Sequence, residues 1–365
     1  MKILCIITTS FILGGGLTNS YLNYYYSFNH NEIHVDFCSS NEINEELKDT
    51  IQSHGDNYFK APRRKKVLSY ILFLKKIIKE NNYSLIHIHG NSSTMSLEIF
   101  ASKKAGNNNI IVHSHNVRTK HKFLNQLLNN YLIKNSRVKL ACSKEAGEWL
   151  YKGNSFYVIN NFIDYNKFVF NLEKRENIRK EFNISSNDIL IGTIGRLNSQ
   201  KNQIFLLSSL QKILKGNNKL IIVGNGEKRN EIENKIKELN LENNVILAGF
   251  RTDVDAFMSA FDLFVFPSIY EGYGMVLIEA QASGLSCICS NKVPKTTNFG
   301  LVEYSELEQN LFLSSVEDKL YNLNIINRQD NIKTFNDNVK QKHFDKESCV
   351  KKLLDIYFEE GKEKK

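Results

Sequence analysis

The chain has 365 residues, of which 42% are hydrophobic and 24% charged, and this balance is typical of globular proteins rather than disordered or fibrous ones. At roughly 100–200 residues per domain, its length indicates two domains. No apolar run approaches the roughly 20 residues that cross a bilayer, so we expect no membrane-spanning helix. The net charge of +9 lies in residues 1–168, which hold 21 Lys+Arg against 12 Asp+Glu. This basic half predicts an acidic partner: a membrane surface, a nucleic acid or a phosphorylated ligand.

Short apolar runs alternate with helical patterns through the first half of the chain. Strands are expected at 2–9, 32–39, 84–90, 109–116 and 138–143, with helical patterns at 17–28, 67–82, 93–106 and 123–136 between them. The first run is interrupted by Thr8 and Thr9, so it indicates a buried strand rather than an export signal. The alternation predicts a parallel sheet covered by helices on both faces.

The same alternation restarts after a polar stretch near residues 165–187. Strands are expected at 188–197, 219–226, 244–250, 263–268 and 286–291, with helices at 203–216, 228–241, 253–262 and 272–284. We therefore predict an α/β protein of two Rossmann-like domains, residues 1–165 and 166–340. A final helix within 341–365 is expected to pack back on the first domain. Ligands bind at the carboxyl ends of strands in such sheets, which places the expected site in a cleft between the domains.

Two carboxylates lie eight residues apart in the segment that follows the strand at 263–268. Glu271 precedes a helix expected to begin near Met275, and Glu279 lies about one turn into it. Backbone N–H groups of Gly274 and Met275 would be unpaired at that helix N-terminus, which forms an anion-binding site. One carboxylate can hold sugar hydroxyls and the other a ribose. The spacing alone fits equally well a helix cap and a solvated side chain.

The segment EGYGMVLIEAQASG resembles the E-x7-E signature of glycosyltransferase family 4, a large retaining family with the GT-B fold. Three further segments match the family in the same order, namely VINNFIDYNKF, GTIGRLNSQKN and IIVGNGEKRNEI. The segments IIVHSHN and ACSKEAGEWL resemble its capsular and exopolysaccharide branch. The resemblance covers about residues 1–300 and implies two Rossmann-like domains whose parallel sheets face each other across a cleft.

The resemblance also implies roles for individual residues. Arg196 and Lys201 match the basic pair that holds the donor diphosphate, where fixed cations stabilise the charge that develops on the leaving group. Glu271 matches the position that contacts the transferred sugar, and Glu279 matches the one that binds the nucleotide ribose. Double displacement and front-face attack both remain open for Glu271, and we favour front-face attack.

Weaker matches complete the predicted site. They are Gly15, Gly16, His115, Gly224, Phe250, Gly274 and Met275. Gly15 and Gly16 match a loop whose backbone approaches phosphate closely. His115 matches a histidine near the transferred sugar, to which a neutral imidazole can hydrogen-bond. His87 and His89 are interpreted as strand-end residues, with contact to the acceptor as the weaker alternative, and His113 is expected to face the same side as His115 but deeper.

No metal or other cofactor is predicted. Asp253 and Asp255 form a D-x-D pattern, which in another glycosyltransferase fold binds a divalent cation with the substrate phosphates. Here the pattern opens an amphipathic helix, where Thr252 or Asp253 suits the N-cap and Asp255 complements the helix dipole. The six cysteines have no C-x-x-C spacing. Arg196 and Lys201 are expected to neutralise the diphosphate instead.

A basic cluster precedes the apolar helix expected at 67–82. Its members are Lys60, Arg63, Arg64, Lys65 and Lys66. Such a segment can attract anionic lipid headgroups, while the apolar stripe of the helix is expected to pack mainly on the sheet. No recognised nucleic-acid motif occurs, so nucleic acid is not the expected partner. We predict a cytoplasmic protein bound peripherally to the inner face of the cytoplasmic membrane.

These observations together predict a hexosyl- or N-acetylhexosaminyltransferase. It would move a sugar from a nucleotide-diphosphate donor to a lipid-linked oligosaccharide in the synthesis of a bacterial surface polysaccharide (capsule, exopolysaccharide or O-antigen). We expect the nucleotide of the donor to be UDP. One alternative is a nucleotide-sugar epimerase of the same fold, which would need further acid and base groups. Another is a non-catalytic, two-domain sugar-binding protein, which would need an export signal.

Overall fold

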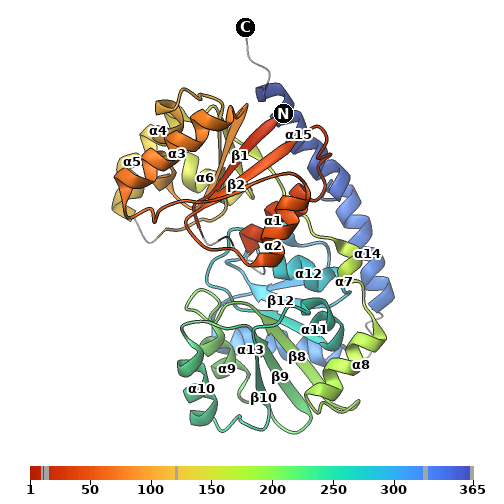
Figure 1. Ribbon diagram of the computed structural model, residues 1–365. Helices are drawn as coiled ribbons and strands as arrows, with labels where there is room; N and C mark the ends of the chain where they lie inside the picture. The colour runs from red at the N-terminus through yellow and green to blue at the C-terminus, as the bar shows by residue number, and fades with distance from the viewer. Residues whose placement is uncertain (10, 12–15, 120–121, 324–327, 362–365) are drawn as a thin grey trace. The chain divides into compact units, whose positions relative to one another are not determined.

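The computed structural model describes residues 1–9, 11, 16–119, 122–323 and 328–361 (Figure 1). Contacts divide the chain into unit 1, Met1–Phe162 with Phe344–Lys365, and unit 2, Ile163–His343. Each unit has its own sheet and its own hydrophobic core. Within the described ranges, no helix is both long enough and apolar enough to cross a bilayer.

Unit 1 contains a seven-stranded parallel sheet in the order β3-β2-β1-β4-β5-β6-β7. The strands are β1 Lys2–Ile7, β2 His34–Ser39, β3 Tyr58–Lys60, β4 Leu85–Gly90, β5 Ile110–Ser114, β6 Val138–Ala141 and β7 Tyr157–Val158. The direction of winding reverses between β1 and β4. The edge strands β3 and β7 were not expected from the sequence, because three and two residues are too few to show a period.

Seven α-helices surround the sheet of unit 1 in its described part. They are α1 Gly16–Tyr25, α2 Glu45–Ser53, α3 Val67–Asn81, α4 Ser96–Lys104, α5 Lys122–Asn135, α6 Lys144–Tyr151 and α15 Lys346–Gly361. Figure 1 shows α3, α4 and α5 on the opposite side of this sheet from α15. The structure places α15 in unit 1, where it buries Leu353 and Tyr357 in the core with Tyr21 of α1.

Unit 2 contains a six-stranded parallel sheet in the order β10-β9-β8-β11-β12-β13. The strands are β8 Ile189–Ile194, β9 Asn218–Val223, β10 Val245–Gly249, β11 Leu263–Phe266, β12 Cys287–Ser290 and β13 Val302–Ser305. The winding reverses here between β8 and β11. In open parallel sheets, such a reversal leaves a crevice at the carboxyl ends of the two strands, and ligands bind there.

The helices of unit 2, within its described residues, are α7 Tyr165–Phe168, α8 Leu172–Glu181, α9 Gln203–Leu210, α10 Arg229–Glu238, α11 Val254–Ala260, α12 Met275–Ala282, α13 Gln309–Tyr321 and α14 Arg328–Gln341. The sequence did not predict α8, since most of its residues are polar. Ion pairs rather than an apolar stripe hold α8 in place: Arg175 Nη2 lies 2.6 Å from Asp262 Oδ1, and Lys174 Nζ lies 2.5 Å from Asp255 Oδ2.

Candidate functional site

The candidate site of unit 2 lies where the winding of its sheet reverses. The loop after β8 carries Lys201, and the loop after β11 carries Glu271. Lys201 Nζ lies 2.7 Å from Glu271 Oε1, and these side chains are only 19% and 9% exposed. The same ammonium group lies 4.5 Å from the ring centroid of Phe266, the last residue of β11. Neighbouring parallel strands therefore bring together two residues that are 70 positions apart.

Hydrogen bonds tie these two loops to each other. The backbone N–H of Ile269 donates to the Gln200 carbonyl at 2.9 Å, and Gln200 Nε2 donates to the Tyr270 carbonyl at 3.0 Å. Within the first loop, the backbone N–H of Lys201 donates to Asn198 Oδ1 at 3.0 Å. Sequence reasoning did not single out Asn198 or Gln200, although both lie inside the matched segment GTIGRLNSQKN. Their bonds fix the backbone from which the ion pair projects.

Gly224 brings the loop after β9 against the loop after β8. It has φ of +138°, and a Cβ atom at this position would lie 2.0 Å from the carbonyl oxygen of Gly195. The Gly195 N–H donates to the Val223 carbonyl at 2.9 Å, so the two backbones are in direct contact. A glycine at 224 is therefore required by sterics. It shapes the edge of the site rather than supplying a chemical group.

Helix α12 begins beside Glu271 and carries Glu279. Gly274 is its N-cap residue, with φ of +88°, and Met275 is its first residue. Glu279 is partly buried, and burial raises its pKa to about 7, against the opposing charges of Lys167 and Lys201. Lys167 of α7 was not named from the sequence, although it lies in the matched segment VINNFIDYNKF. The charge of Lys201 thus acts on both predicted glutamates.

Arg196 and Phe250 lie at the same edge of the sheet but outside this ion pair. The Arg196 side chain is 69% exposed, and its Nε lies 3.3 Å from Glu227 Oε2. Phe250 follows β10 and is 63% exposed. Both side chains are free to meet a ligand that approaches from solvent, and neither is part of the buried core of the site.

Both carboxylates of the D-x-D pattern form ion pairs within unit 2. Asp253 stands at the N-cap position of α11, but the expectation that its side chain caps the helix is wrong. Its carboxylate accepts two hydrogen bonds from Arg251, from Nε at 2.8 Å and Nη2 at 2.7 Å. The guanidinium offers a paired, charge-assisted contact, which is stronger than a bond to one backbone N–H. The same bonds lower the pKa of Asp253, while Asp255 pairs with Lys174.

Of the residues predicted in unit 1, Gly15 lies outside the described residues and Gly16 begins α1. His115 follows β5, and its Nε2 lies 2.9 Å from Nδ1 of His89. Burial lowers the pKa of His115 to about 3, so its ring is neutral at physiological pH. Sequence reasoning placed His113 on the same side as His115, and the structure also brings His87 and His89 of β4 against these two rings.

The residues of the basic cluster before α3 are not all exposed. The prediction that Arg64 binds a membrane is wrong, because its side chain is held inside unit 1. Its Nε and Nη2 donate to the two oxygens of the fully buried Glu98 at 2.8 and 3.0 Å. Tyr70 donates to the same carboxylate at 2.8 Å, so Arg64 balances a buried charge. Arg63, Lys65 and Lys66 are exposed, and the exposed Lys60 pairs with Glu42.

The family models match the two units of the chain separately, whereas the relatives match across both. The family "Glycosyltransferase Family 4" matches residues 14–167, and "Glycosyl transferases group 1" matches residues 174–298. EpsF of Bacillus subtilis (strain 168), whose name describes a glycosyltransferase, is 29% identical over 304 residues, covering 79% of each chain. An Escherichia coli protein named UDP-Gal:alpha-D-GlcNAc-diphosphoundecaprenol alpha-1,3-galactosyltransferase is 27% identical over 309 residues, covering 73% of this chain and 79% of its own.

Solved structures match the whole fold. The crystal structure of HepE from Anabaena in complex with UDP-glucose has a TM-score of 0.80 at 18% identity, and the match covers 98% of this chain and 100% of HepE. The two family matches fall one on each unit and together span about three quarters of the chain. The chain belongs to glycosyltransferase family 4, and its two Rossmann-like units form the GT-B fold.

Proposed function

We propose that this chain is a retaining glycosyltransferase that moves a hexosyl or N-acetylhexosaminyl group from a UDP-sugar to a lipid-linked saccharide in the synthesis of bacterial surface polysaccharide. The observation that carries the proposal is the Lys201–Glu271 ion pair at the winding reversal of unit 2. The names of the relatives support the choice of substrates. The Escherichia coli relative is named for a UDP-Gal donor and a diphosphoundecaprenol-linked acceptor, and HepE was crystallised with UDP-glucose.

The ion pair suits the charge changes of glycosyl transfer. When the bond between the anomeric carbon and the β-phosphate oxygen breaks, the electron pair stays on the diphosphate. A fixed ammonium at Lys201 stabilises that charge in the transition state more than in the ground state. Arg196 is an exposed second cation that can grip two phosphate oxygens at once. Helix α12 begins at Met275 after Gly274, and the first N–H groups of a helix can bind an anion.

The pairing of Glu271 with Lys201 favours front-face attack over double displacement. A carboxylate held by an ammonium at 2.7 Å has its charge neutralised, which makes it a weaker nucleophile. In the front-face step, the acceptor hydroxyl oxygen bonds to the anomeric carbon on the side from which the diphosphate leaves. The hydroxyl proton passes to the departing phosphate oxygen. Glu271 then orients sugar hydroxyls, and Glu279 accepts hydrogen bonds from the ribose.

No divalent cation is part of this proposed step, because the chain's own cations balance the diphosphate. The D-x-D carboxylates that could have held a cation are bonded to Arg251 and Lys174. Removing Asp255 from its partner would leave Lys174 without that counter-charge, whereas Arg251 would keep its ion pair with Glu181. Lys201 and Arg196 therefore carry the electrostatic role that a metal ion has in other glycosyltransferases.

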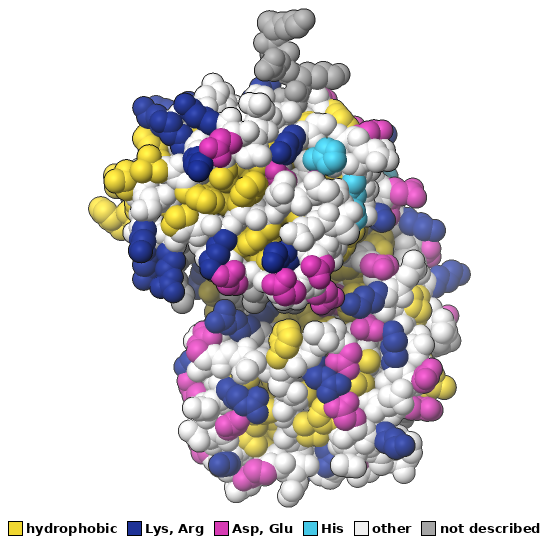
Figure 2. Space-filling view, viewed as in Figure 1, with side chains coloured by type: hydrophobic (Ala, Val, Ile, Leu, Met, Phe, Trp, Pro, Cys, Tyr) yellow, Lys and Arg dark blue, Asp and Glu magenta, His cyan; other side chains and the backbone are white. Residues whose placement is uncertain are grey.

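An apolar and basic surface of unit 1 supports binding to an anionic membrane. Figure 2 shows apolar side chains over α3–α5 with Lys and Arg around them. The exposed fractions are 73% for Leu68, 56% for Leu72, 77% for Phe123 and 65% for Leu127. The expectation that the stripe of α3 is core holds only for Tyr70, Leu74, Ile77 and Ile78. Exposed apolar groups beside lysines fit the interface of an anionic leaflet, and we propose a peripheral position on the cytoplasmic face.

Two measurements test the proposed substrates. Thermal unfolding of the full chain is recorded with a panel of UDP-, GDP- and TDP-sugars, and UDP-sugars should raise the midpoint most. The stabilising donor is then incubated with a synthetic acceptor carrying GlcNAc on a lipid diphosphate, and the anomeric configuration of the product is read by NMR. Absence of stabilisation by every UDP-sugar, or a product with inverted configuration, would contradict the proposal.

Flotation with vesicles tests the membrane surface. The double variant Leu68→Ser/Phe123→Ser should lose at least tenfold in partitioning to vesicles of phosphatidylglycerol and phosphatidylcholine, since each buried apolar side chain contributes about 1.5–3 kcal/mol. The matched control is Leu311→Ser/Tyr321→Ser in unit 2, whose side chains are 53% and 87% exposed in the native chain. Equal binding by both double variants would exclude the α3–α5 surface as the contact.

A further inference from the structure

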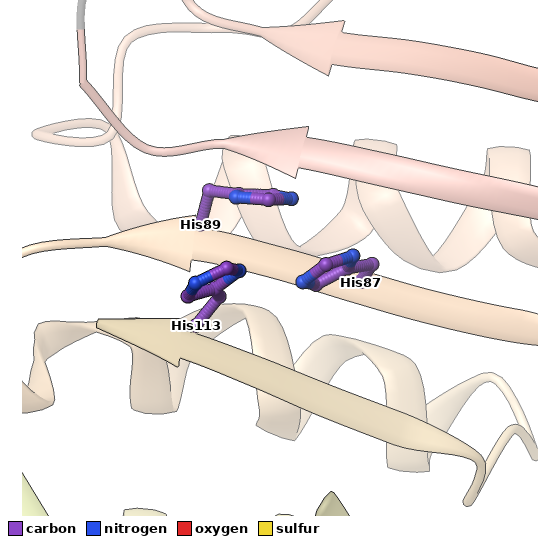
Figure 3. A group of neighbouring side chains, drawn as sticks. All are labelled: His87, His89 and His113. Atoms are coloured by element: carbon purple, nitrogen blue, oxygen red, sulfur yellow. The ribbon is translucent and has the colours of Figure 1, made fainter. Parts of the chain in front are cut away.

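Three buried histidines of unit 1 point their rings toward one another (Figure 3). His87 and His89 alternate along β4 and so lie on one face of the sheet, and the register of β5 places His113 opposite His89. One ring nitrogen from each of these three residues lies within 4.8 Å of the other two. In the described part of the chain, no other group of three or more His, Cys, Asp or Glu residues meets this criterion.

The inward nitrogens of this cluster lack partners. His87 and His89 are completely buried, and His113 is 3% exposed. Among the described residues, no donor or acceptor meets Nε2 of His87, Nε2 of His89, or either ring nitrogen of His113. A buried polar atom without a hydrogen bond costs about 1–3 kcal/mol. These unpaired atoms are unfavourable, and a ligand that takes one nitrogen from each ring would satisfy three of the four.

The outward nitrogens, in contrast, are held. Nδ1 of His87 lies 2.6 Å from the Tyr357 hydroxyl, which lies 3.1 Å from the Tyr21 hydroxyl. Nδ1 of His89 lies 2.9 Å from Nε2 of His115. A histidine that binds a metal through one nitrogen usually has the other fixed by such a partner, which sets its tautomer and its orientation. Two of the three rings have this arrangement.

The chemical state of the rings also suits a metal. The burial of His87, His89 and His113 disfavours the charged imidazolium form. A neutral imidazole keeps the lone pair that a metal ion needs. The cluster contains no carboxylate, which disfavours Mg²⁺ and Ca²⁺ because both prefer oxygen ligands.

We propose that His87, His89 and His113 together bind one divalent transition-metal ion, with Zn²⁺ as the expected ion. Zn²⁺ takes three imidazole nitrogens at about 2.0–2.1 Å, which places them about 3.4 Å apart in a tetrahedral site. Rotations that move the ring nitrogens by about 1 Å would close the observed group to that geometry. The ion would link β4 to β5 beneath α1 and α15, beside the reversal between β1 and β4. This site lies in unit 1, where its ligand His89 contacts His115, and it stabilises the fold rather than supplying a reacting group.

The direct test is the metal content of the full chain. The protein is refolded with excess Zn²⁺, exchanged into metal-free buffer and analysed by plasma mass spectrometry. We expect about one Zn²⁺ per chain, loss of most of it in His113→Gln, and retention in His34→Gln, a control whose histidine lies on β2 with a 46% exposed side chain. A content below about 0.1 equivalents in the wild type would overturn the proposal. Wild-type content in a folded His113→Gln variant would overturn it too.

A second measurement uses the wild-type chain, so its outcome does not depend on whether a variant folds. Co²⁺ loaded in place of Zn²⁺ on the wild-type chain should give the visible absorption of a tetrahedral nitrogen-bound ion, and Zn²⁺ should displace it. Far-UV circular dichroism reports whether His113→Gln folds, and His87→Gln serves as a second ligand variant. An octahedral Co²⁺ spectrum would indicate that the metal binds at the surface, and it would contradict the proposed histidine site. UDP-sugar binding is measured in parallel, because its failure would concern the proposed function alone.

Discussion

The two units place polar side chains at equivalent points of their sheets but in opposite chemical states. In unit 2, Lys201 and Glu271 follow β8 and β11, the pair of strands at which the winding reverses. In unit 1, the reversal lies between β1 and β4, and the backbone N–H and hydroxyl of Thr8 after β1 both donate to the His89 carbonyl on β4, at 3.0 and 2.9 Å. One site is an ion pair with partial exposure, whereas the other is a set of neutral, buried imidazoles.

The two sites differ because their residues lie at different positions relative to the ends of the strands. Lys201 and Glu271 lie five or more residues beyond the ends of their strands, on loops that set the two opposite charges 2.7 Å apart. His87, His89 and His113 lie within their strands, where α1 and α15 cover the face. Topology therefore determines where polar groups collect, and depth within the strand determines whether they can carry charge. The following predictions test that comparison, from the largest expected effect to the smallest.

Replacing Lys201 by alanine should have the largest effect. Loss of the ammonium that contacts Glu271 should lower kcat about 10²–10³-fold, as removal of a single transition-state donor does in other enzymes. Lys212→Ala, an exposed lysine of the same unit, is the control and should retain activity within twofold. Full activity in Lys201→Ala would show that charge at this point of unit 2 has no part in transfer.

Replacing Gly224 by alanine tests whether backbone contact holds the charged site in place. The new Cβ would lie 2.0 Å from the Gly195 carbonyl oxygen, so the loops after β8 and β9 would have to separate, at a cost of about 3 kcal/mol in the free energy of unfolding. In Gly216→Ala, φ is also positive but nothing lies within 4 Å, and the cost should be about 1 kcal/mol. Urea unfolding of both variants measures the difference, and equal values would contradict the steric argument.

The raised pKa of Glu279 predicts a pH dependence of donor binding. Its carboxyl group titrates at about 7, so the fraction able to accept two ribose hydrogen bonds rises with pH. UDP-sugar affinity should increase by up to about tenfold between pH 6 and pH 8, as expected for one ionisation centred in that range. The pyrophosphate of a UDP-sugar does not titrate there, unlike that of free UDP. Titration calorimetry with Glu279→Gln should give a flat profile, and a persistent slope would assign the effect to another group.

The raised pKa of Glu279 also predicts how the stability of the protein changes with pH. In the native state Glu279 binds its proton up to about pH 7, whereas in the unfolded chain a glutamate releases it near pH 4.5. The native state therefore binds more protons between these values, and the contribution of Glu279 to the free energy of unfolding decreases as pH rises from 4.5 to 7. Thermal midpoints of wild type and Glu279→Gln should converge at low pH and separate above pH 7, with the variant more stable.

The smallest effect is expected for added Mg²⁺. Because Lys201 and Arg196 balance the diphosphate in our proposal, millimolar Mg²⁺ should change the Kd for a UDP-sugar by less than about twofold. The measurement is a calorimetric titration with and without the ion at constant ionic strength. A tenfold gain with Mg²⁺ would show that a metal-bound diphosphate is the preferred ligand, and that the ion pairs of Asp253 and Asp255 yield to it.

Much of the fold could be predicted because long parallel strands and amphipathic helices have clear periods in the sequence. The missed elements include α2, α6, α7, α13, α14 and β13, and also three that lack such a signal. The edge strands β3 and β7 are very short, and α8 depends on ion pairs with residues more than 80 positions away. Arg64 illustrates the same difficulty for single residues. A run of cations in the sequence predicts that each of them is exposed. Only the folded structure brings Arg64 into contact with Glu98, which is 34 positions away.

The sequence by itself determined the two-domain α/β organisation, the positions of the glycosyltransferase motifs and the basic character of the first half, since these depend on composition, period and local spacing. The tertiary structure alone decided which of these residues meet. It paired Lys201 with Glu271, removed Arg64 from the basic surface, and exposed one side of α3. It also gathered three histidines from two strands around a common point. The reason is physical, because parallel strands align residues that are distant in the chain, and burial then determines their charge.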